Sequence, residues 1–416
     1  MHLARLPLRV CRVALTCSLL SRTARIATAA GSSRGTGPAR DNWHEQGAGA
    51  CAAGAATLST STSQSERAPA AAGISMTEES MPHDAAAEIR CALDFGSGAT
   101  KMSAARVGAG GAVVVASDTR EILVRQDVAR RGDNTIGPDV LAQVRATAQE
   151  MVSRARQAGA TRFAAVATAV YRTSVNGEAF IQDLSRELDI KILLIDQALE
   201  GAIGYYTAAA LAPPLPRQPG STCTSSPLLA WDSGGGSFQL TIETPGERGR
   251  FSVYGGPCGA STVFAWLLEV QGRDLVRHDS ANPASYAHLS RLEQRIADAL
   301  PPPPSWLQRL PADARVVTFG GESSAFRAAA LATGSSQFSA QQVDAAIRDL
   351  VGRDDSAFET LGHVQPAQVL AKLTLVRTVL RRLLQGRSAA YYPANGSTQG
   401  MLLYADLWLD VKDAPQ

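Results

Sequence analysis

The chain has 416 residues, 45% of them hydrophobic and 19% charged, with 40 basic side chains against 38 acidic ones. That length exceeds what one hydrophobic core normally fills, so two or three domains are expected, and the hydrophobic content excludes a wholly disordered chain. The even charge balance gives no sign of nucleic acid or an acidic membrane as a partner. No run approaches 18 apolar residues, so no membrane span is expected, and six cysteines without a CxxC spacing indicate neither a zinc site nor a disulfide framework.

Residues 1–87 are expected to be a disordered leader. Up to Ser75 the chain carries eight arginines, no lysine and three acids, and a low-complexity stretch without bulky apolar residues lies within it. This composition is typical of an organelle transit peptide. Translation from Met76 or Met81 is the alternative. The first interpretation places the protein in mitochondria or another organelle, and the second places it in the cytoplasm.

From residue 88 on, strand-like and helical patterns alternate. Two short apolar runs joined by the glycine turn GSGAT predict a β-hairpin, and a segment that begins with Pro138 has helical spacing as far as Gly159. Strands are expected at 89–95, 101–107, 113–125, 162–169 and 190–195, and helices at 138–159, 176–188 and 197–211.

The Pro- and Ser-rich segment 213–227 is predicted to be a linker. A second unit then begins as the first does, with a strand, the glycine turn SGGGS and another strand over 228–243. Further strands and helices follow, and the C-terminal third is almost entirely helical. The sequence therefore predicts two α/β domains built on one plan, at 88–212 and 228–396, with a C-terminal helix at 397–411 that packs back on the first domain.

Each unit places an aspartate at the end of a strand, just before its glycine turn: Asp94 before GSGAT and Asp232 close before the three glycines of SGGGS. Glycines let backbone N–H groups converge into a concave anion site, and an aspartate there can hold Mg²⁺ directly or through water. Two such turns on opposing domains would bind the two sides of a phosphate chain, and TFGGESS adds a third turn. The candidate phosphate-binding residues are Gly96, Ser97, Gly234, Gly235, Gly236, Ser237, Gly320 and Gly321.

Five sequence blocks occur in the order and spacing of one known family. They are CALDFGSGATKMSAARV, VATAVYRTSVNGEAFIQDLSREL with IKILLIDQALEGAIGYY, LLAWDSGGGSFQLTI, VVTFGGESSAF and SAAYYPANGSTQGMLLYADLW. On these blocks the chain resembles the exopolyphosphatase / guanosine pentaphosphate phosphohydrolase (Ppx/GppA) family. The resemblance covers residues 88–411, the family's two-domain core, without the extra C-terminal helical domain of its longer members.

The resemblance implies the fold shared by actin, sugar and acetate kinases and heat-shock chaperones: two ribonuclease-H-like domains with the site in the cleft between them. It implies Mg²⁺- or Mn²⁺-dependent hydrolysis of the terminal phosphoanhydride of inorganic polyphosphate, or of the 5′-phosphate of guanosine pentaphosphate. Glu200 occupies the position of the family's proposed base, and Arg172 that of an arginine that would bind phosphate oxygens. Asp94 and Asp232 would hold the metal, with Gln239 as a further candidate.

The chain also departs from the family pattern. Gly98 and Ala99 replace polar residues of the first turn, Leu199 and Ala202 replace a Glu and an Arg around Glu200, and Gln239 stands where a Glu is usual. Glutamine brings no negative charge, so Mg²⁺ affinity and rate are expected to fall.

Several alternatives therefore stay open beside a polyphosphate hydrolase. They are a guanosine pentaphosphate phosphatase, a polyphosphate or nucleotide sensor that has lost turnover, and a sugar or acetate-type kinase. A homodimer is a further open expectation. Arg381 and Arg382, adjacent on a predicted helix, would either line a polyanion channel or form a solvated basic face.

Overall fold

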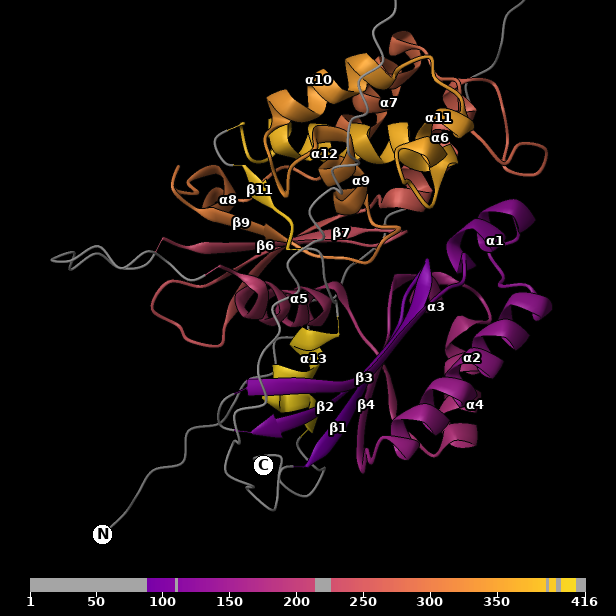
Figure 1. Cartoon of the computed structure of the whole chain (residues 1–416), viewed down its shortest axis with the longest axis vertical. Coiled ribbons are helices and arrows are strands. Elements are labelled where there is room, and N and C mark those ends of the chain that lie inside the picture. Colours follow the sequence, from indigo (N-terminus) through magenta and orange to yellow (C-terminus); the bar gives the residue numbers. More distant parts are fainter. Residues whose placement is uncertain (1–87, 109–110, 214–225, 387–388, 394–397, 409–416) are drawn as a thin grey trace, which may run out of the picture. The chain divides into compact units, whose positions relative to one another are not determined.

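The computed structural model describes residues 88–108, 111–213, 226–386, 389–393 and 398–408 (Figure 1). The predicted leader lies outside these residues, and so does nearly all of the predicted linker. In the described part of the chain, no helix is long and apolar enough to cross a membrane.

The first sheet has five strands in the order β3-β2-β1-β4-β5. The first three strands are antiparallel neighbours, and β4 and β5 run parallel to β1 on its other side. Their bounds are β1 (Ile89–Phe95), β2 (Ala99–Gly108), β3 (Gly111–Glu121), β4 (Arg162–Ala167) and β5 (Ile192–Leu194). The strand predicted over 113–125 was wrong at its end, because β3 stops at Glu121 and the unpredicted helix α1 (Val124–Arg131) follows.

Helices cover both faces of the first sheet. Successive strand side chains point to opposite faces, so Cys91 and Leu93 of β1 share a core with α2 (Pro138–Gln157) and α4 (Gly177–Leu188), while Ala92 faces the other way. On that other side lie α5 (Gln197–Leu211) and α13 (Gln399–Leu403), which contact each other. The predicted helix at 397–411 forms α13 and, within the described residues, a separate turn η2 (Ala405–Trp408).

The second sheet repeats the plan of the first. Its order is β10-β11-β9-β6-β7-β8, in which β6, β7 and β8 are antiparallel neighbours and β9 and β11 continue in parallel beyond β6. The bounds are β6 (Leu228–Ser233), β7 (Phe238–Glu243), β8 (Phe251–Gly256), β9 (Arg315–Thr318), β10 (Gln337–Phe338) and β11 (Ala390–Tyr391). The predicted α/β class with two similar sheets is confirmed.

A layer of helices packs on the second sheet (Figure 1). It consists of α6 (Ala260–Val270), α7 (Tyr286–Ala299), α8 (Ser305–Gln308), α9 (Ala325–Thr333), α10 (Ala340–Leu350), α11 (Asp355–Thr360), η1 (Pro366–Gln368) and α12 (Val369–Arg382). Helix α12 contacts α6, α7, α9 and α10, and every residue from Val369 to Leu380 is buried. A helix buried on all sides is normally apolar throughout, but α12 carries Lys372 and Arg377.

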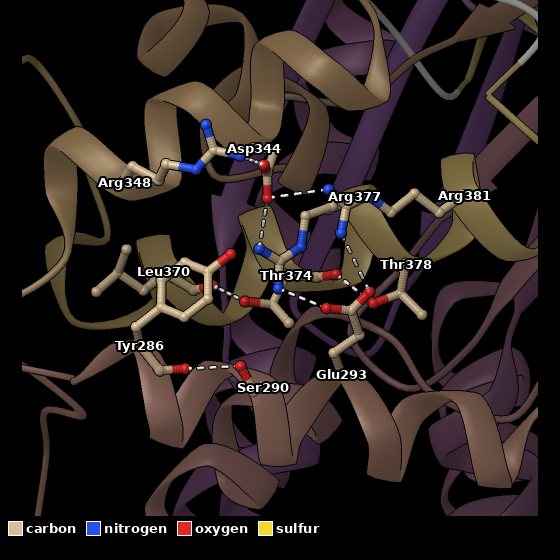
Figure 2. Close-up of polar contacts among 10 residues, drawn as sticks. All are labelled: Tyr286, Ser290, Glu293, Asp344, Arg348, Leu370, Thr374, Arg377, Thr378 and Arg381. Carbon is tan, nitrogen blue, oxygen red and sulfur yellow. Dashed lines mark hydrogen bonds and ion pairs between the residues drawn. The ribbon is translucent and has the colours of Figure 1, made fainter.

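A buried ion-pair cluster accommodates the second of these charges (Figure 2). Arg377 Nη1 lies 3.0 Å from Asp344 Oδ1 of α10, and Arg377 Nη2 lies 2.7 Å from Glu293 Oε2 of α7. Arg381 pairs with the same two carboxylates at 3.1 and 3.7 Å, and Arg348 also pairs with Asp344. Arg381 is therefore a partner of two largely buried acids, which neither of the alternatives drawn from the sequence foresaw.

Candidate active site

The predicted site residues gather where parallel strands end. Asp94 lies at the carboxyl end of β1, Arg172 follows β4 in α3 (Ala169–Thr173), and Glu200 follows β5 in α5. In the second sheet β6 ends around Asp232, and its parallel neighbour β9 leads into Gly320. Carboxyl ends of parallel strands meet at one edge of a sheet, which is where α/β folds bind ligands.

The two glycine turns have the same construction. Gly96 N–H donates to the Ala99 carbonyl at 3.0 Å, and Gly234 N–H donates to the Ser237 carbonyl at 2.9 Å. A Cβ on Gly96 would lie 2.9 Å from the Ala99 carbonyl oxygen, so a larger residue does not fit there. The N–H groups of Gly96 and Gly234 therefore close the turns, and the N–H groups left for a ligand are those between them.

In the second turn, two N–H groups point the same way. The carbonyls of Gly234 and Gly235 accept hydrogen bonds, each of 2.9 Å, from the N–H groups of Ala260 and Ser261 at the start of α6. In a trans peptide the C=O of one residue and the N–H of the next point in opposite directions. The N–H groups of Gly235 and Gly236 thus point away from α6, and within the described residues neither has a hydrogen-bond partner. Adjacent N–H groups of this kind form an anion-binding nest.

The first turn is anchored in a similar way. The Ser97 carbonyl accepts from Arg125 N–H at 3.0 Å, and the Gly98 carbonyl accepts from Ile122 N–H at 3.1 Å. By the same peptide geometry, the Gly98 N–H points away from the start of α1. Both turns therefore direct their carbonyls at the segment that begins a following helix.

The two turns face each other at contact distance. A Cβ placed on Gly235 would lie 3.3 Å from Ser97 Cβ and 3.0 Å from Ser261 Oγ, and one on Gly236 would lie 3.6 Å from Ser97 Oγ. Ser97 and Ser237 are both buried. The absence of a side chain at Gly235 lets the first turn approach the second this closely, whereas a Cβ on Gly236 would meet Ser97 at an ordinary van der Waals distance.

Five charged groups act on one another beside these turns. Burial and the negative charges of Asp232 and Asp94 raise the pKa of Glu200 to about 8, while the charges of Arg172 and Lys101 oppose that rise. Burial raises the pKa of Asp232 to about 6, against the effect of Lys101 and with a further contribution from Asp94. Glu200 Oε2 is buried and has no hydrogen-bond partner within the described residues. A carboxylate in this state is a candidate general base.

Packing of α5 fixes Glu200 in this place. The helix starts at the cap Asp196, whose carboxylate accepts from Leu199 N–H at 2.8 Å. Helix α5 then lies against β6, β7 and β8, and a Cβ on Gly201 would lie only 2.7 Å from Thr241 Oγ1. A Cβ on Gly204 would lie 3.7 Å from Asp232 Cβ. Gly201 thus lets the helix that carries Glu200 pack closely on β7, and Gly204 of the same helix lies at van der Waals distance from Asp232.

A backbone carbonyl holds the guanidinium of Arg172. Its Nη1 donates to the Ile195 carbonyl at the end of the β5 segment. Thr168, which precedes α3, donates from its N–H to the Phe95 carbonyl at 3.2 Å and so ties the start of α3 to the end of β1. Asn176 bonds both backbone groups of Ile136, at 2.9 and 2.8 Å, in place of capping α4 with its side chain.

Gln239 lies directly across the β6–β7 hairpin from Asp232. Its side chain is 1% exposed, its Nε2 donates to Ser237 Oγ at 3.4 Å, and its Oε1 has no partner in the described part of the chain. A buried amide oxygen without a protein partner is chemically suited to ligate a cation or accept from water.

The carbonyls of the third glycine turn bond to groups outside the charged cluster. Tyr392 Oη donates to the Gly320 carbonyl at 2.8 Å, and the Gly321 carbonyl accepts from Ser324 N–H at 3.0 Å. Among the described residues, neither glycine is hydrogen-bonded to the five charged side chains. Gly320 and Gly321 share the sheet edge of Asp232 without joining its cluster.

One member of the cluster was not predicted. Lys101 Nζ lies 3.4 Å from Asp94 Oδ2, because the β1–β2 register places the two residues opposite each other. A four-residue turn at 96–99 already requires that register, so counting outward from GSGA would have found Lys101 from the sequence. The same count places Gln239 opposite Asp232.

The donors suit a hard cation that the substrate would share. Asp94, Asp232 and Gln239 offer oxygens, which Mg²⁺ prefers, and Mg²⁺ usually keeps water and phosphate oxygens as its other ligands. Within the described residues, no group of three or more His, Cys, Asp or Glu is arranged to hold a metal by itself. These residues therefore fit a phosphate-bridged ion better than one enclosed by protein.

Comparison with known proteins agrees with this geometry. Residues 103–252 match the model of the Ppx/GppA phosphatase family, which confirms the resemblance predicted from the sequence. Comparison with curated proteins gives no match.

Solved structures of similar proteins show the fold. An exopolyphosphatase-like protein is 18% identical with a TM-score of 0.59, over 76% of this chain and 97% of that one. The Ppx/GppA enzyme of Aquifex aeolicus is 15% identical with a TM-score of 0.56, over 76% and 99%. An exopolyphosphatase from Cytophaga hutchinsonii is 13% identical with a TM-score of 0.59, over 77% and 98%. This chain has the fold of these proteins.

Proposed function

We propose that the chain is a Mg²⁺-dependent hydrolase that releases terminal phosphate from inorganic polyphosphate. The proposal rests on the Ppx/GppA match over residues 103–252 and on the arrangement of the candidate active site. The observation that carries the proposal is that Glu200, whose Oε2 is buried, is coupled to the charges of Asp94 and Asp232, the aspartates that precede two facing glycine turns. A phosphate site and a general base are the two parts that such a hydrolysis needs.

Each part has a defined task. The N–H groups of Gly235 and Gly236 would donate to oxygens of the terminal phosphate, and the remaining N–H groups of Arg172 would stabilise the charge that grows there. Glu200, once ionised, would accept a proton from the water that attacks phosphorus. Asp94 and Asp232 would hold Mg²⁺, and the bound ion would supply charge that offsets that of the phosphate. Its positive charge would also favour the ionised form of Glu200.

Side-by-side substrates test the proposal. Phosphate release is measured with the full chain and Mg²⁺ on long-chain polyphosphate, guanosine pentaphosphate and ATP. Polyphosphate is expected to be the best substrate, and release from guanosine pentaphosphate alone would replace the proposal with the nucleotide phosphatase. Absence of release from all three would overturn hydrolysis.

A non-hydrolysing polyphosphate sensor is the second candidate, and Gln239 is the observation that favours it. The residue across from Asp232 is neutral, so the site has one negative charge fewer with which to hold a cation. Tight binding of polyphosphate without phosphate release would support the sensor.

Replacing Gln239 with glutamate is expected to lower the Mg²⁺ concentration for half-maximal phosphate release ~10-fold, because it adds a carboxylate opposite Asp232. Turnover at limiting Mg²⁺ should rise with it. Titration of Mg²⁺ against phosphate release measures both. Gln149→Glu, the same change on the exposed surface of α2, is the matched control. A titration curve identical to that of the unaltered protein would contradict the account of Gln239.

A further inference from the structure

Lys372 is a buried lysine whose hydrogen-bond partners are neutral. Its side chain lies in the middle of the helical layer, and the residue is 2% exposed. Its Nζ donates to the Ser323 carbonyl at 2.8 Å and to Gln365 Oε1 at 2.5 Å. The chain has four lysines, at 101, 191, 372 and 412. One of these few lysines therefore lies in the hydrophobic core.

The two partners of Lys372 lie in different segments, one of which contains the third glycine turn. Ser323 lies in the turn after β9 that contains Gly320 and Gly321. Gln365 donates in turn from Nε2 to Glu121, at the end of β3.

Glu121 connects this bridge to the first glycine turn. In the β2–β3 register it pairs with Ala99, and the next residue, Ile122, donates to the Gly98 carbonyl at 3.1 Å. A continuous path of hydrogen bonds and register pairs thus runs from the first glycine turn through Gln365 and Lys372 to the third.

Burying a charge at this position costs folding free energy. Burial lowers the pKa of Lys372 to about 7, and Glu121 is the charge that opposes this. His363 and Arg327 are the other titratable groups coupled to this position. Burial, with the charges of Lys372 and Arg327, lowers the pKa of His363 to about 4. An apolar residue would avoid the cost of burying the ammonium, since α12 is otherwise packed on all sides.

We propose that Lys372 is a positioning residue that holds the turn at 320–324 against the end of β3, and so sets the spacing between the first and third glycine turns. The effect on substrate binding rests on the proposed function. The spacing between these two turns decides how tightly a polyphosphate chain is bound. The ammonium does not touch the reacting atoms, so its loss should change binding more than the chemical step.

Hydrogen exchange without substrate tests the structural half. Lys372→Met, which keeps the stem and removes the ammonium, should speed amide exchange ~10-fold or more at both 119–124 and 319–325. Lys372→Arg should restore part of the protection. Lys191→Met, the same change at an exposed lysine, is the control and should alter neither segment. Unchanged exchange at both segments in Lys372→Met would overturn the proposal.

Kinetics test the functional half. In Lys372→Met the KM for polyphosphate should rise ~10-fold, while kcat changes less than about 3-fold. An equal fall in kcat and kcat/KM would overturn the positioning role. If the unaltered protein releases no phosphate, the proposed function fails, and the exchange data still decide the role of Lys372.

A second variant covers the case in which Lys372→Met does not fold. Gln365→Leu changes a partly exposed residue and removes the link to Glu121. Faster exchange at 119–124, with 319–325 still protected by the bond from Lys372 to Ser323, is expected. Unchanged exchange at 119–124 in this variant would equally overturn the proposal.

Discussion

Replacing Glu200 with glutamine is expected to slow phosphate release from polyphosphate ~10²–10⁴-fold, because an amide cannot accept the proton of the attacking water. Shape and hydrogen-bonding capacity are nearly preserved, so substrate binding should change little. The measurement is steady-state phosphate release with saturating Mg²⁺ over a range of polyphosphate concentrations. A rise in KM with kcat unchanged would show that Glu200 binds substrate without acting as the base.

Stability provides an independent check on the same variant. The pKa of Glu200 is raised to about 8, above its value in an unfolded chain, so its ionised form costs folding free energy. At pH values above the unfolded-state pKa, Glu200 keeps a proton in the folded chain that it has lost in the unfolded chain. The resulting cost in folding free energy grows with pH until about pH 8. Glu200→Gln should therefore unfold at the same temperature as the unaltered protein or at a higher one.

Glu178→Gln is the matched control, because Glu178 is an exposed residue of α4. It should leave both phosphate release and the unfolding temperature unchanged. If Glu200→Gln loses activity and also unfolds at a clearly lower temperature, loss of structure explains the kinetics and the role as base is contradicted.

Local patterns in the sequence predicted most of the fold. Strand periodicity, glycine turns and the proline at the start of α2 depend on neighbours within a few residues, and the two sheets and their shared plan follow from them. The start of α1 was missed because Ile122 and Arg125 bond to the first glycine turn, more than twenty residues earlier. Long-range hydrogen bonds of this kind leave no trace in local periodicity.

Local sequence predicted some features of the candidate site, and long-range packing set the others. The sequence predicted the glycine turns. It did not predict that the N–H groups of Gly96 and Gly234 form the hydrogen bonds that close these turns. Turn geometry decides this, and residue identity alone does not. Lys101 was within reach of a register count, whereas the approach of Glu200 to Asp232 depends on how α5 packs on the second sheet. Roles in catalysis stay predictions for all of these residues.

Replacing Asp344 with asparagine is expected to lower the free energy of unfolding by about 3–5 kcal/mol. Asp344 is 3% exposed and pairs with Arg377, Arg381 and Arg348 (Figure 2). Without its charge, Glu293 is the only acid left in the cluster to balance the buried Arg377. Urea unfolding measures the change, and Asp349→Asn, on the exposed side of the same helix, should change stability by less than about 0.5 kcal/mol.

A double-mutant cycle separates the charge effect from lost packing. Arg377→Met removes the buried cation and keeps most of the apolar stem, so Arg381 and Arg348 still balance Asp344. In the double variant the uncompensated guanidinium is gone, and the combined loss should be smaller than the sum of the single losses by at least ~1 kcal/mol. Strict additivity would mean that the 3.0 Å contact between Asp344 and Arg377 contributes no coupling, and would contradict the account of this ion pair.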